Sequence, residues 1–332
     1  MSDYQQLKRP RRLRMNAGVR AMQQEVHIRV EQLVQPIFIK AGMNIKNEIA
    51  SMPGIYQYTL DNLPEYLLEL NADGVKNIIL FGIPEDKDAQ GSAAWQADGI
   101  VQQAIKVCKS ILPEMVVIAD CCFCEYTDHG HCGVISETTG CPDVDNDATL
   151  TLLAKQAVSL VKAGADIIAP SGAMDGMVYA IRTALDKNAA QHIPIMSYSM
   201  KYASHFYGPF RDAAEGAPQF GDRRTYQADF ANVNEALREA ALDIEEGTDF
   251  LMVKPAMPYL DILYKLKQAY PEYPMVAYQV SGEYAMIQAA AQNGWLDGEK
   301  TMFESLIAIK RAGADIIITY FAQAFCARYA KI

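Results

Sequence analysis

A junction that recurs along the chain constrains the fold more than any other feature. Lys162-Ala-Gly-Ala-Asp166 precedes the apolar run Ile167-Ile-Ala-Pro-Ser171, and Arg311-Ala-Gly-Ala-Asp315 precedes Ile316-Ile-Ile-Thr-Tyr320. Related junctions, with Gly74 and Gly247, precede two more apolar runs. In each junction a glycine can end a helix in the left-handed conformation before a β-rich segment begins. The pattern indicates a chain of alternating helices and strands.

Counting the apolar runs predicts eight strands. Most of them are apolar throughout and do not alternate, as expected for parallel strands that are covered on both faces. Pro36 counts against the first strand, because proline cannot donate to the ladder. The predicted strands are 33–40, 77–82, 115–121, 166–172, 194–201, 249–255, 274–281 and 315–322. Eight such units predict an α/β fold of the (β/α)₈ TIM barrel class.

The part of the chain outside these units predicts an extended N-terminal arm. We expect residues 1–32 to form this arm and to make oligomer contacts, and residues 33–332 to form the catalytic barrel. The basic run Arg9-Pro-Arg-Arg-Leu-Arg14 favours contact with a neighbouring subunit over contact with another acidic partner. The alternative fold is a doubly wound sheet, but no G-x-G-x-x-G or Walker A motif supports it. Long loops are expected at 40–66, 83–98, 122–147 and 202–230.

The composition narrows the classes of function. The 332 residues are half apolar and carry a formal net charge of −10, which argues against a nucleic-acid or membrane-surface role. No uncharged apolar stretch approaches the roughly 18 to 20 residues of a membrane-spanning helix. The polar start Ser2-Asp3-Tyr4-Gln5-Gln6 does not resemble a secretory signal. Several of the seven cysteines are too close together to pair without strain, so we expect reduced thiols and a cytoplasmic location.

Residues 120–132 concentrate soft metal ligands at the end of the third predicted strand. The segment reads Asp-Cys-Cys-Phe-Cys-Glu-Tyr-Thr-Asp-His-Gly-His-Cys and holds four of the seven cysteines. Thiolate and imidazole ligands favour zinc, and strand ends are where barrels collect their chemistry. The alternative is that these are buried thiols that act as small hydrophobes. Because Cys122 and Cys124 share a strand face and Cys132 follows a His-Gly-His turn, metal binding is the preferred interpretation.

Two lysines end adjacent predicted strands. Lys201 closes Ile195-Met-Ser-Tyr-Ser-Met-Lys201, and Lys254 follows Met252-Val253. Burial and a second nearby cation both lower a lysine pKa, which frees the amine to form a Schiff base with a carbonyl. Lowering the pKa from about 10.4 to about 7.5 requires roughly 4 kcal/mol. The alternative, in which each side chain extends to solvent, is weaker for two lysines than for one.

Polar side chains near the remaining strand ends complete the candidate site. Arg211 and Arg223 lie on a glycine-containing loop after the fifth strand, where a guanidinium can clamp a carboxylate. Ser281 and Tyr320 end the seventh and eighth strands and offer neutral donors to a second carboxylate. The residues alone therefore predict a zinc-assisted, lysine-dependent enzyme that joins two small keto acids.

With these residues in view, the chain resembles the zinc-type branch of the porphobilinogen synthase (5-aminolevulinate dehydratase) family from Arg9 to its end. The resemblance implies a hydro-lyase of heme biosynthesis, which condenses two molecules of 5-aminolevulinate to porphobilinogen with loss of two waters. The stretches that carry it are Cys122-Phe-Cys124, His129-Gly-His-Cys132, Val144-Asp-Asn-Asp-Ala-Thr149, Ala169-Pro-Ser-Gly-Ala-Met-Asp-Gly176, Met196-Ser-Tyr-Ser-Met-Lys201, Phe206-Tyr-Gly-Pro-Phe-Arg211, Met252-Val-Lys-Pro-Ala256 and Tyr278-Gln-Val-Ser-Gly-Glu-Tyr284.

The resemblance also implies how the first substrate is held. Lys254 would bind it as a Schiff base, and Ser281 and Tyr320 would bind its carboxylate. Asp120 and Ser171 would shape the pocket near the lysines.

For the second substrate, the resemblance implies a different set of contacts. Lys201 would engage the substrate, and its carboxylate would meet Arg211, Arg223 and Gln227. Tyr207 would cover the pocket.

The metals and the assembly are implied in the same way. Cys122, Cys124 and Cys132 would hold a catalytic zinc and leave one position open. Glu239 resembles a position that binds an allosteric magnesium in some bacterial members, although a solvated helix carboxylate is an equal interpretation. Members form octamers through their N-terminal arms, which would explain the basic run.

The chain departs from the family pattern at several positions. The stretch 135–143 is longer than the usual lid, so the lid conformation is not carried over, and it adds Cys141 as an extra thiol. Asp128 stands where serine is common and adds a negative charge beside the metal loop. Cys121 lies on the opposite strand face, so we do not expect it to be a ligand.

Two alternative functions remain open at this stage. One is a Schiff-base aldolase on the same barrel, which would leave Lys201 and the cysteines unused. The other is a structural or redox zinc protein, in which His131 or Cys141 closes a four-ligand site.

Overall fold

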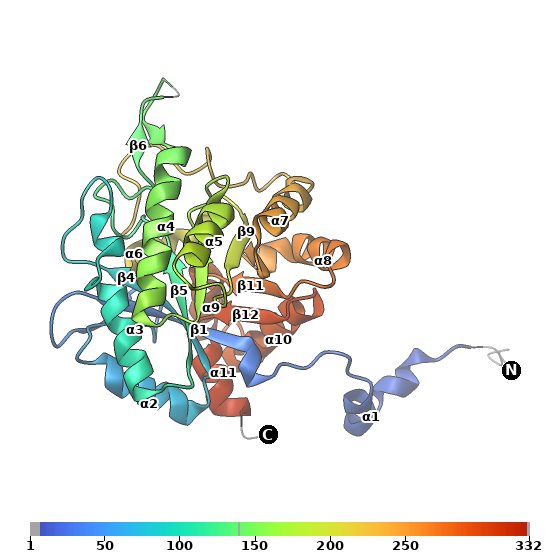
Figure 1. The fold of residues 1–332 in the computed structure, drawn as a ribbon. Helices are drawn as coiled ribbons and strands as arrows, with labels where there is room; N and C mark the ends of the chain where they lie inside the picture. The colour runs from blue at the N-terminus through green and yellow to red at the C-terminus, as the bar shows by residue number, and fades with distance from the viewer. Residues whose placement is uncertain (1–6, 139, 331–332) are drawn as a thin grey trace, which may run out of the picture.

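Eight parallel strands form a nearly closed barrel in the computed structural model, which describes residues 7–138 and 140–330 (Figure 1). Their order is β8-β5-β4-β1-β12-β11-β10-β9, and a parallel bridge between Ile168 of β8 and Ile195, just before β9, brings the two edges together. The barrel strands are β1 (Leu33–Lys40), β4 (Asn77–Ile83), β5 (Val116–Cys121), β8 (Ile167–Pro170), β9 (Met196–Lys201), β10 (Phe250–Lys254), β11 (Met275–Gln279) and β12 (Ile316–Thr319). The predicted TIM-barrel fold is confirmed, and the doubly wound alternative is wrong.

Helices surround the barrel and connect its strands (Figure 1). They are α2 (Leu63–Asp73), α3 (Ile100–Ile111), α4 (Asn146–Ala163), α5 (Met177–Lys187), α6 (Gly208–Ala213), α7 (Glu235–Glu246), α8 (Leu260–Ala269), α9 (Ser281–Gln292), α10 (Gly298–Arg311) and α11 (Ala322–Tyr329). Short 3₁₀ turns are η3 (Ser92–Trp95), η4 (His205–Tyr207) and η5 (Met257–Tyr259), and short strands are β2 (Lys46–Glu48), β3 (Tyr56–Tyr58), β6 (Ile135–Ser136) and β7 (Asp143–Val144). None of the helices within the described ranges has the length and apolar character needed to cross a membrane.

The recurring sequence junction ends a helix and connects neighbouring strands where the strands begin. Gly164 and Gly247 end α4 and α7 with φ of 109° and 97°, where an L side chain would be strained. The aspartate that follows then accepts a hydrogen bond from a backbone N–H of the neighbouring strand. These bonds are Val117 N to Asp166 at 2.7 Å, Ile195 N to Asp249 at 2.7 Å and Met275 N to Asp315 at 2.8 Å. The junction therefore ends a helix and joins two strands at the amino-terminal end of the barrel.

The first strand keeps its place despite Pro36. The ladder between β1 and β12 pairs Leu33 with Ile317 and Val34 with Ile318, and it stops before the proline is reached. On its other side, β1 stays paired with β4 through Lys40. Proline therefore lies where one ladder has already ended, which agrees with its tolerance at unpaired strand positions.

The N-terminal arm extends away from the barrel (Figure 1). Within its described part, η1 (Pro10–Arg14), α1 (Ala17–Met22) and η2 (Val30–Gln32) precede β1. Asn16 caps α1 by accepting from the backbone N–H of Gly18 at 2.7 Å. The first six residues of the predicted arm lie outside the described residues.

Candidate active site

The carboxyl ends of β9 and β10 place two lysines side by side. Lys201 and Lys254 are the last residues of these strands and are paired in the parallel register. Both side chains are buried, and both nitrogens face the ring of Tyr198, at 5.6 Å and 5.0 Å from its centroid. The two amines therefore share one pocket at the mouth of the barrel.

Aromatic rings surround the amine of Lys254. Its Nζ lies 4.2 Å from the ring centroid of Tyr278 and 5.2 Å from that of Phe210. Burial, followed by the charge of Lys201, lowers the pKa of Lys254 to about 7. A large fraction of this amine is therefore uncharged near neutral pH, which is the form that attacks a carbonyl.

Lys201 has a different electrostatic environment. Its Nζ donates a hydrogen bond to the backbone carbonyl of Ser171 at 2.5 Å. Burial acts to lower the pKa of Lys201, but negative charge on the cysteines, first of all Cys132, raises it above its usual range. The expected lowering of both lysine pKa values is therefore wrong for Lys201, because the sequence could not show how near the thiolates would lie.

Three cysteines converge beside the lysines. The Sγ atoms of Cys122, Cys124 and Cys132 lie within 4.8 Å of one another and are buried, and those of Cys122 and Cys124 are 3.5 Å apart. Thiolates on a tetrahedral zinc, at about 2.3 Å each, lie about 3.8 Å from one another. Hydrogen bonds from Cys122 and Cys124 lower the pKa of Cys132 well below its usual range. The cluster therefore has the spacing and the negative charge that suit a soft divalent cation.

Other candidate ligands are engaged elsewhere. Both ring nitrogens of His131 have partners, the hydroxyl of Tyr226 at 3.0 Å and the carbonyl of Phe220 at 3.0 Å. Cys121 points away, with its Sγ 3.2 Å from Oε1 of Gln156, as predicted. Cys141 is exposed, and neither it nor His131 belongs to a converging donor group among the described residues. The structure thus offers no support for a closed four-ligand site.

Comparison with known proteins identifies the family. A family model described as delta-aminolevulinic acid dehydratase matches residues 7–328. Delta-aminolevulinic acid dehydratases from Halalkalibacterium halodurans and Staphylococcus epidermidis are 55% and 54% identical over 316 and 318 residues, covering 95% and 96% of this chain and 95% and 97% of theirs. The chain belongs to the delta-aminolevulinic acid dehydratase family. This membership decides against the aldolase alternative.

A solved structure of the same family agrees in fold. The delta-aminolevulinic acid dehydratase (porphobilinogen synthase) of Toxoplasma gondii, in complex with the reaction product porphobilinogen, matches with a TM-score of 0.94 at 40% identity. The match covers 98% of this chain and 92% of that one. The dehydratase fold therefore extends over the whole barrel.

Three predicted carboxylate contacts in this dehydratase have donors without partners. The Nε atoms of Arg211 and Arg223 and the Nε2 atom of Gln227 are buried and have no hydrogen-bond partner among the described residues. Arg223 uses its Nη2 to bond the carbonyls of Gly130 and Gly216, both at 2.8 Å. Buried donors normally have partners, so a group of unpaired ones indicates a place for an anionic ligand.

The donors predicted for the first substrate are engaged with protein groups. Ser281 Oγ accepts from the backbone N–H of Phe210 at 2.9 Å, and the hydroxyls of Tyr320 and Tyr278 are 3.2 Å apart. The hydroxyl of Tyr207, predicted to cover the pocket, donates to the carbonyl of Tyr202 at 2.8 Å and lies 3.2 Å from the carbonyl of Lys254. The barrel mouth brings these side chains to one place, with their hydroxyls in local hydrogen bonds.

Asp120, in β5, and Ser171, directly after β8, lie together. The hydroxyl of Ser171 donates to Oδ2 of Asp120 at 3.0 Å, whereas Oδ1 of Asp120 is buried without a partner among the described residues. Burial, followed by the charge of Glu125, raises the pKa of Asp120 to about 7. This carboxyl group can therefore hold or release a proton near neutral pH.

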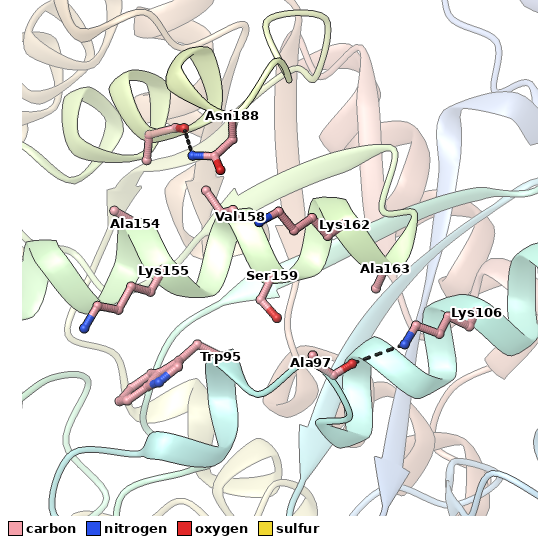
Figure 2. A pocket seen from close by; sticks show the side chains of 11 residues that line it. Trp95, Ala97, Lys106, Ala154, Lys155, Val158, Ser159, Lys162, Ala163 and Asn188 are labelled. Atoms are coloured by element: carbon pink, nitrogen blue, oxygen red, sulfur yellow. Dashed lines mark hydrogen bonds between the residues drawn. The ribbon is translucent and has the colours of Figure 1, made fainter.

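Two cavities lie in different parts of the molecule, one beside Lys201 and the other on the outside of the barrel. One, of about 730 Å³, is lined by Lys201 and Gln227 and continues along α7, where it includes Glu239. The other, of about 540 Å³, lies outside the barrel among α3, α4 and α5, with Trp95 and Lys155 on its wall (Figure 2). Of the predicted site residues, Lys201, Gln227 and Glu239 line the first cavity, and none lines the second.

The stretch expected to be a longer lid contains a two-stranded hairpin. β6 and β7 pair antiparallel, and Ile135 lies opposite Val144. Asp143 accepts a hydrogen bond from the hydroxyl of Thr225 at 2.9 Å, which ties the hairpin to the loop that carries Arg223. Residue 139 lies outside the described residues.

Sequence reasoning missed three residues that the structure places at the site. Tyr198 presents its ring to both lysines, and Glu125 forms a second donor group with Asp120 and Cys122. Glu283 is fully buried beside Ser281. Tyr198 and Glu283 do lie inside quoted motifs, three residues before Lys201 and two after Ser281, and this proximity was the available signal.

Proposed function

We propose that this chain is a porphobilinogen synthase that uses Lys254 and Lys201 as Schiff-base lysines toward two molecules of 5-aminolevulinate. The observation that carries this proposal is the pair of buried lysines, in register on β9 and β10, beside the three-cysteine cluster. A dehydratase of this family needs two carbonyl-capturing groups for two keto acids, and this arrangement supplies them.

The lysines act on the ketone carbons. The uncharged amine of Lys254 attacks the ketone of the first substrate. Lys201, whose pKa is raised, first passes a proton to a neighbouring group and then captures the ketone of the second substrate in the same way. In each case a C–N bond forms and the ketone oxygen leaves as water. Formation of the carbon–carbon and carbon–nitrogen bonds of porphobilinogen then releases both amines, so that two waters and one product leave a regenerated enzyme. Asp120, with its pKa near 7, is the nearby group suited to exchange protons during these steps.

The substrate carboxylates meet two sets of donors. We assign the carboxylate of the second substrate to Arg211, Arg223 and Gln227, whose unpaired donors support this role. We assign the carboxylate of the first substrate to Ser281 and Tyr320. Tyr207 and Ser171 complete the pocket through their bonds to Lys254 and Asp120.

Two metals are proposed, at different places. We assign zinc to Cys122, Cys124 and Cys132, because three converging thiols favour a soft cation. When bound, zinc would supply Lewis-acid chemistry toward the second substrate. We assign magnesium to Glu239 on α7, where Asp175 and Asp243 add negative charge and burial raises the pKa of Glu239.

The assembly and location follow from the arm and the thiols. We propose that residues 1–32 join subunits into an octamer and that residues 33–332 form the catalytic unit. The protein is assigned to the cytoplasm, because Cys122, Cys124 and Cys132 must stay reduced to bind metal.

The test combines trapping and metal removal. Borohydride reduction in the presence of 5-aminolevulinate is expected to leave a covalent mass on Lys254, mapped by peptide mass spectrometry. A chelator is expected to abolish turnover while the far-ultraviolet circular dichroism of the barrel stays unchanged. Absence of any adduct on Lys254 would rule out the proposed chemistry, and turnover that survives complete metal removal would rule out the proposed zinc role.

A further inference from the structure

Glu283 is a buried carboxylate with an unusual set of partners. It is the third residue of α9, and its side chain is fully buried. Its Oε2 accepts from the backbone N–H of Val280 at 2.6 Å and from that of Ala256 at 3.4 Å, and its Oε1 accepts from that of Met257 at 2.5 Å. One side chain thus binds three backbone groups and no other side chain among the described residues.

These backbone groups belong to two different strand ends. Val280 directly follows β11, whereas Ala256 and Met257 form the turn after β10, two and three residues beyond Lys254. Glu283 therefore fastens the turn after Lys254 to the start of α9. The ladder between β10 and β11 does not reach this turn, because it ends with Val253 paired to Ala277. A weaker contact, from Nε2 of Gln279 to Sδ of Met257 at 3.5 Å, also joins the two segments.

The same helix start also holds a third segment. Ser281 accepts from the backbone N–H of Phe210. The carbonyl of Lys254 accepts from the backbone N–H of Tyr202 at 3.0 Å, and the hydroxyl of Tyr207 lies 3.2 Å from it. The backbone of Lys254 is thus held at its carbonyl by Tyr202 and through the turn that follows by Glu283. Fixing the backbone limits where the lysine amine can travel.

A carboxylate suits this position and an amide does not. Three backbone N–H groups point at the two carboxylate oxygens. In a glutamine an NH₂ group replaces one of these oxygens, so that a donor would face a donor. The start of α9 also favours a negative charge. Burial raises the pKa of Glu283 to about 7, and the bonds from Val280, Met257 and Ala256 act in the opposite direction.

We propose that Glu283 is a positioning residue for the reaction, which holds the turn after Lys254 so that its amine faces the substrate ketone. Glu283 touches neither lysine side chain and acts only through the backbone that it binds. The inference rests on the proposed role of Lys254 as the first Schiff-base lysine.

The test compares three variants of the full-length protein. Glu283→Gln keeps the side-chain size and loses one acceptor, whereas Glu283→Asp keeps the charge and is one methylene too short to hold both segments. Gln102→Leu is the matched control, because Gln102 is equally buried but bonds the carbonyl of Ala94 on the outside of the barrel. Each protein is mixed with 5-aminolevulinate and quenched with borohydride, and the rate of adduct formation on Lys254 is measured.

We expect trapping to slow about tenfold in Glu283→Gln and by less in Glu283→Asp. The control should lose comparable thermal stability and trap at the wild-type rate. Hydrogen exchange in peptides that span Ala256 and Met257 should speed up in both Glu283 variants and stay unchanged in the control.

The outcomes separate this inference from the proposed function. A wild-type protein that gives no adduct on Lys254 would remove the proposed function itself. A wild-type adduct that forms equally fast in Glu283→Gln would overturn the positioning role alone, as would equal slowing in Gln102→Leu. Should Glu283→Gln not fold, Glu283→Asp decides: wild-type trapping combined with wild-type exchange would end the proposal.

Discussion

At the scale of single residues, Lys201 and Lys254 carry the same group in different electrical surroundings. Thiolate charge acts on Lys201 and raises its pKa, whereas Lys254 faces aromatic rings and has a pKa of about 7. The two amines therefore differ in the fraction that is uncharged, and so able to attack a carbonyl, at a given pH. Near neutral pH a large fraction of Lys254 is uncharged, which fits its proposed place as the first to capture a substrate.

This difference predicts a pH dependence for Lys254. Its pKa is lowered, so the amine is charged and unreactive below about pH 7 and becomes free as the pH rises through that value. The rate of borohydride trapping on Lys254 is expected to fall about tenfold for each pH unit below 7 and to level off above it. Trapping rates between pH 5.5 and 8.5, followed by mass spectrometry, measure this.

Lys201→Met provides the control. Removing the neighbouring charge should raise the pKa of Lys254 and move the midpoint of the trapping curve to higher pH. A curve that stays flat between pH 6 and 8 in the wild type, or one that does not move in the variant, contradicts this account.

Gln227 gives the cleanest test of the carboxylate site. Its Nε2 is buried without a partner among the described residues, so Gln227→Leu removes this donor without breaking a hydrogen bond that it makes within the described protein. A hydrogen bond to a charged group contributes about 1.5–3 kcal/mol, so KM is expected to rise about tenfold or more with a smaller change in kcat. Steady-state kinetics with 5-aminolevulinate measure this. The exposed Gln219→Leu should leave KM unchanged, and an unchanged KM in Gln227→Leu would argue against the assignment.

The site could be predicted only in part from residue types. The convergence of Cys122, Cys124 and Cys132 and the pairing of the lysines follow from strand ends, which the sequence marks. The raised pKa of Lys201 and the bond between Ser281 and Phe210 depend on distances between segments far apart in the chain, and no local pattern encodes them.

At the scale of elements, the residues that join the strands and the residues proposed to react lie at opposite ends of the barrel. The aspartates of the repeated junctions bond neighbouring strands where the strands begin, and the lysines stand where the strands end. Asp249 directly precedes the short strand β10, and Lys254 is its last residue. Changes at one end of the strand should therefore leave the other end largely undisturbed.

Asp249→Ala tests this separation. It leaves the buried backbone N–H of Ile195 without its acceptor, which should cost about 1–3 kcal/mol of stability. Tm from differential scanning calorimetry should fall, while kcat at 25 °C stays close to the wild-type value. Asp186→Ala, which removes an exposed ion pair with Arg182, should cost about 0–1 kcal/mol. A loss of kcat in Asp249→Ala equal to that of a site variant would show that the two ends are coupled.

Elements of the barrel were predictable because each repeats one pattern. All eight strands occur where apolar runs predict them, although several end two or three residues early, as β12 does at Thr319. Those final residues turn out of the ladder to form the site. The hairpin of β6 and β7 was not predicted, since its pairing of Ile135 with Val144 depends on a loop with no periodic signal.

At the scale of the whole molecule, the arm leaves apolar side chains uncovered. Leu13, Met15 and Met22 are 54%, 71% and 88% exposed. Burying such side chains is favourable, so an arm of this kind gains stability when it lies against another subunit. This exposure supports the proposed oligomer contacts.

Deleting residues 1–14 is expected to shift the protein from an octamer to a smaller assembly. The deletion removes the basic run together with Leu13, and light scattering coupled to gel filtration measures the mass. Substituting Arg9, Arg11, Arg12 and Arg14 by glutamine in the intact chain separates the role of charge from that of apolar contact. An unchanged mass in the deletion would show that the arm does not hold the assembly.

Because Lys201 and Lys254 are paired in the parallel ladder, the sheet fixes the distance between their backbones. Adjacent strands stand about 4.8 Å apart, and this spacing is set by peptide hydrogen bonds that no loop movement can stretch. The separation at which two ketones can be presented is then inherited from the backbone itself. A substrate homologue with an extra methylene between its ketone and its amine would therefore not fit the fixed distance between the two lysines, even if the covering loops move.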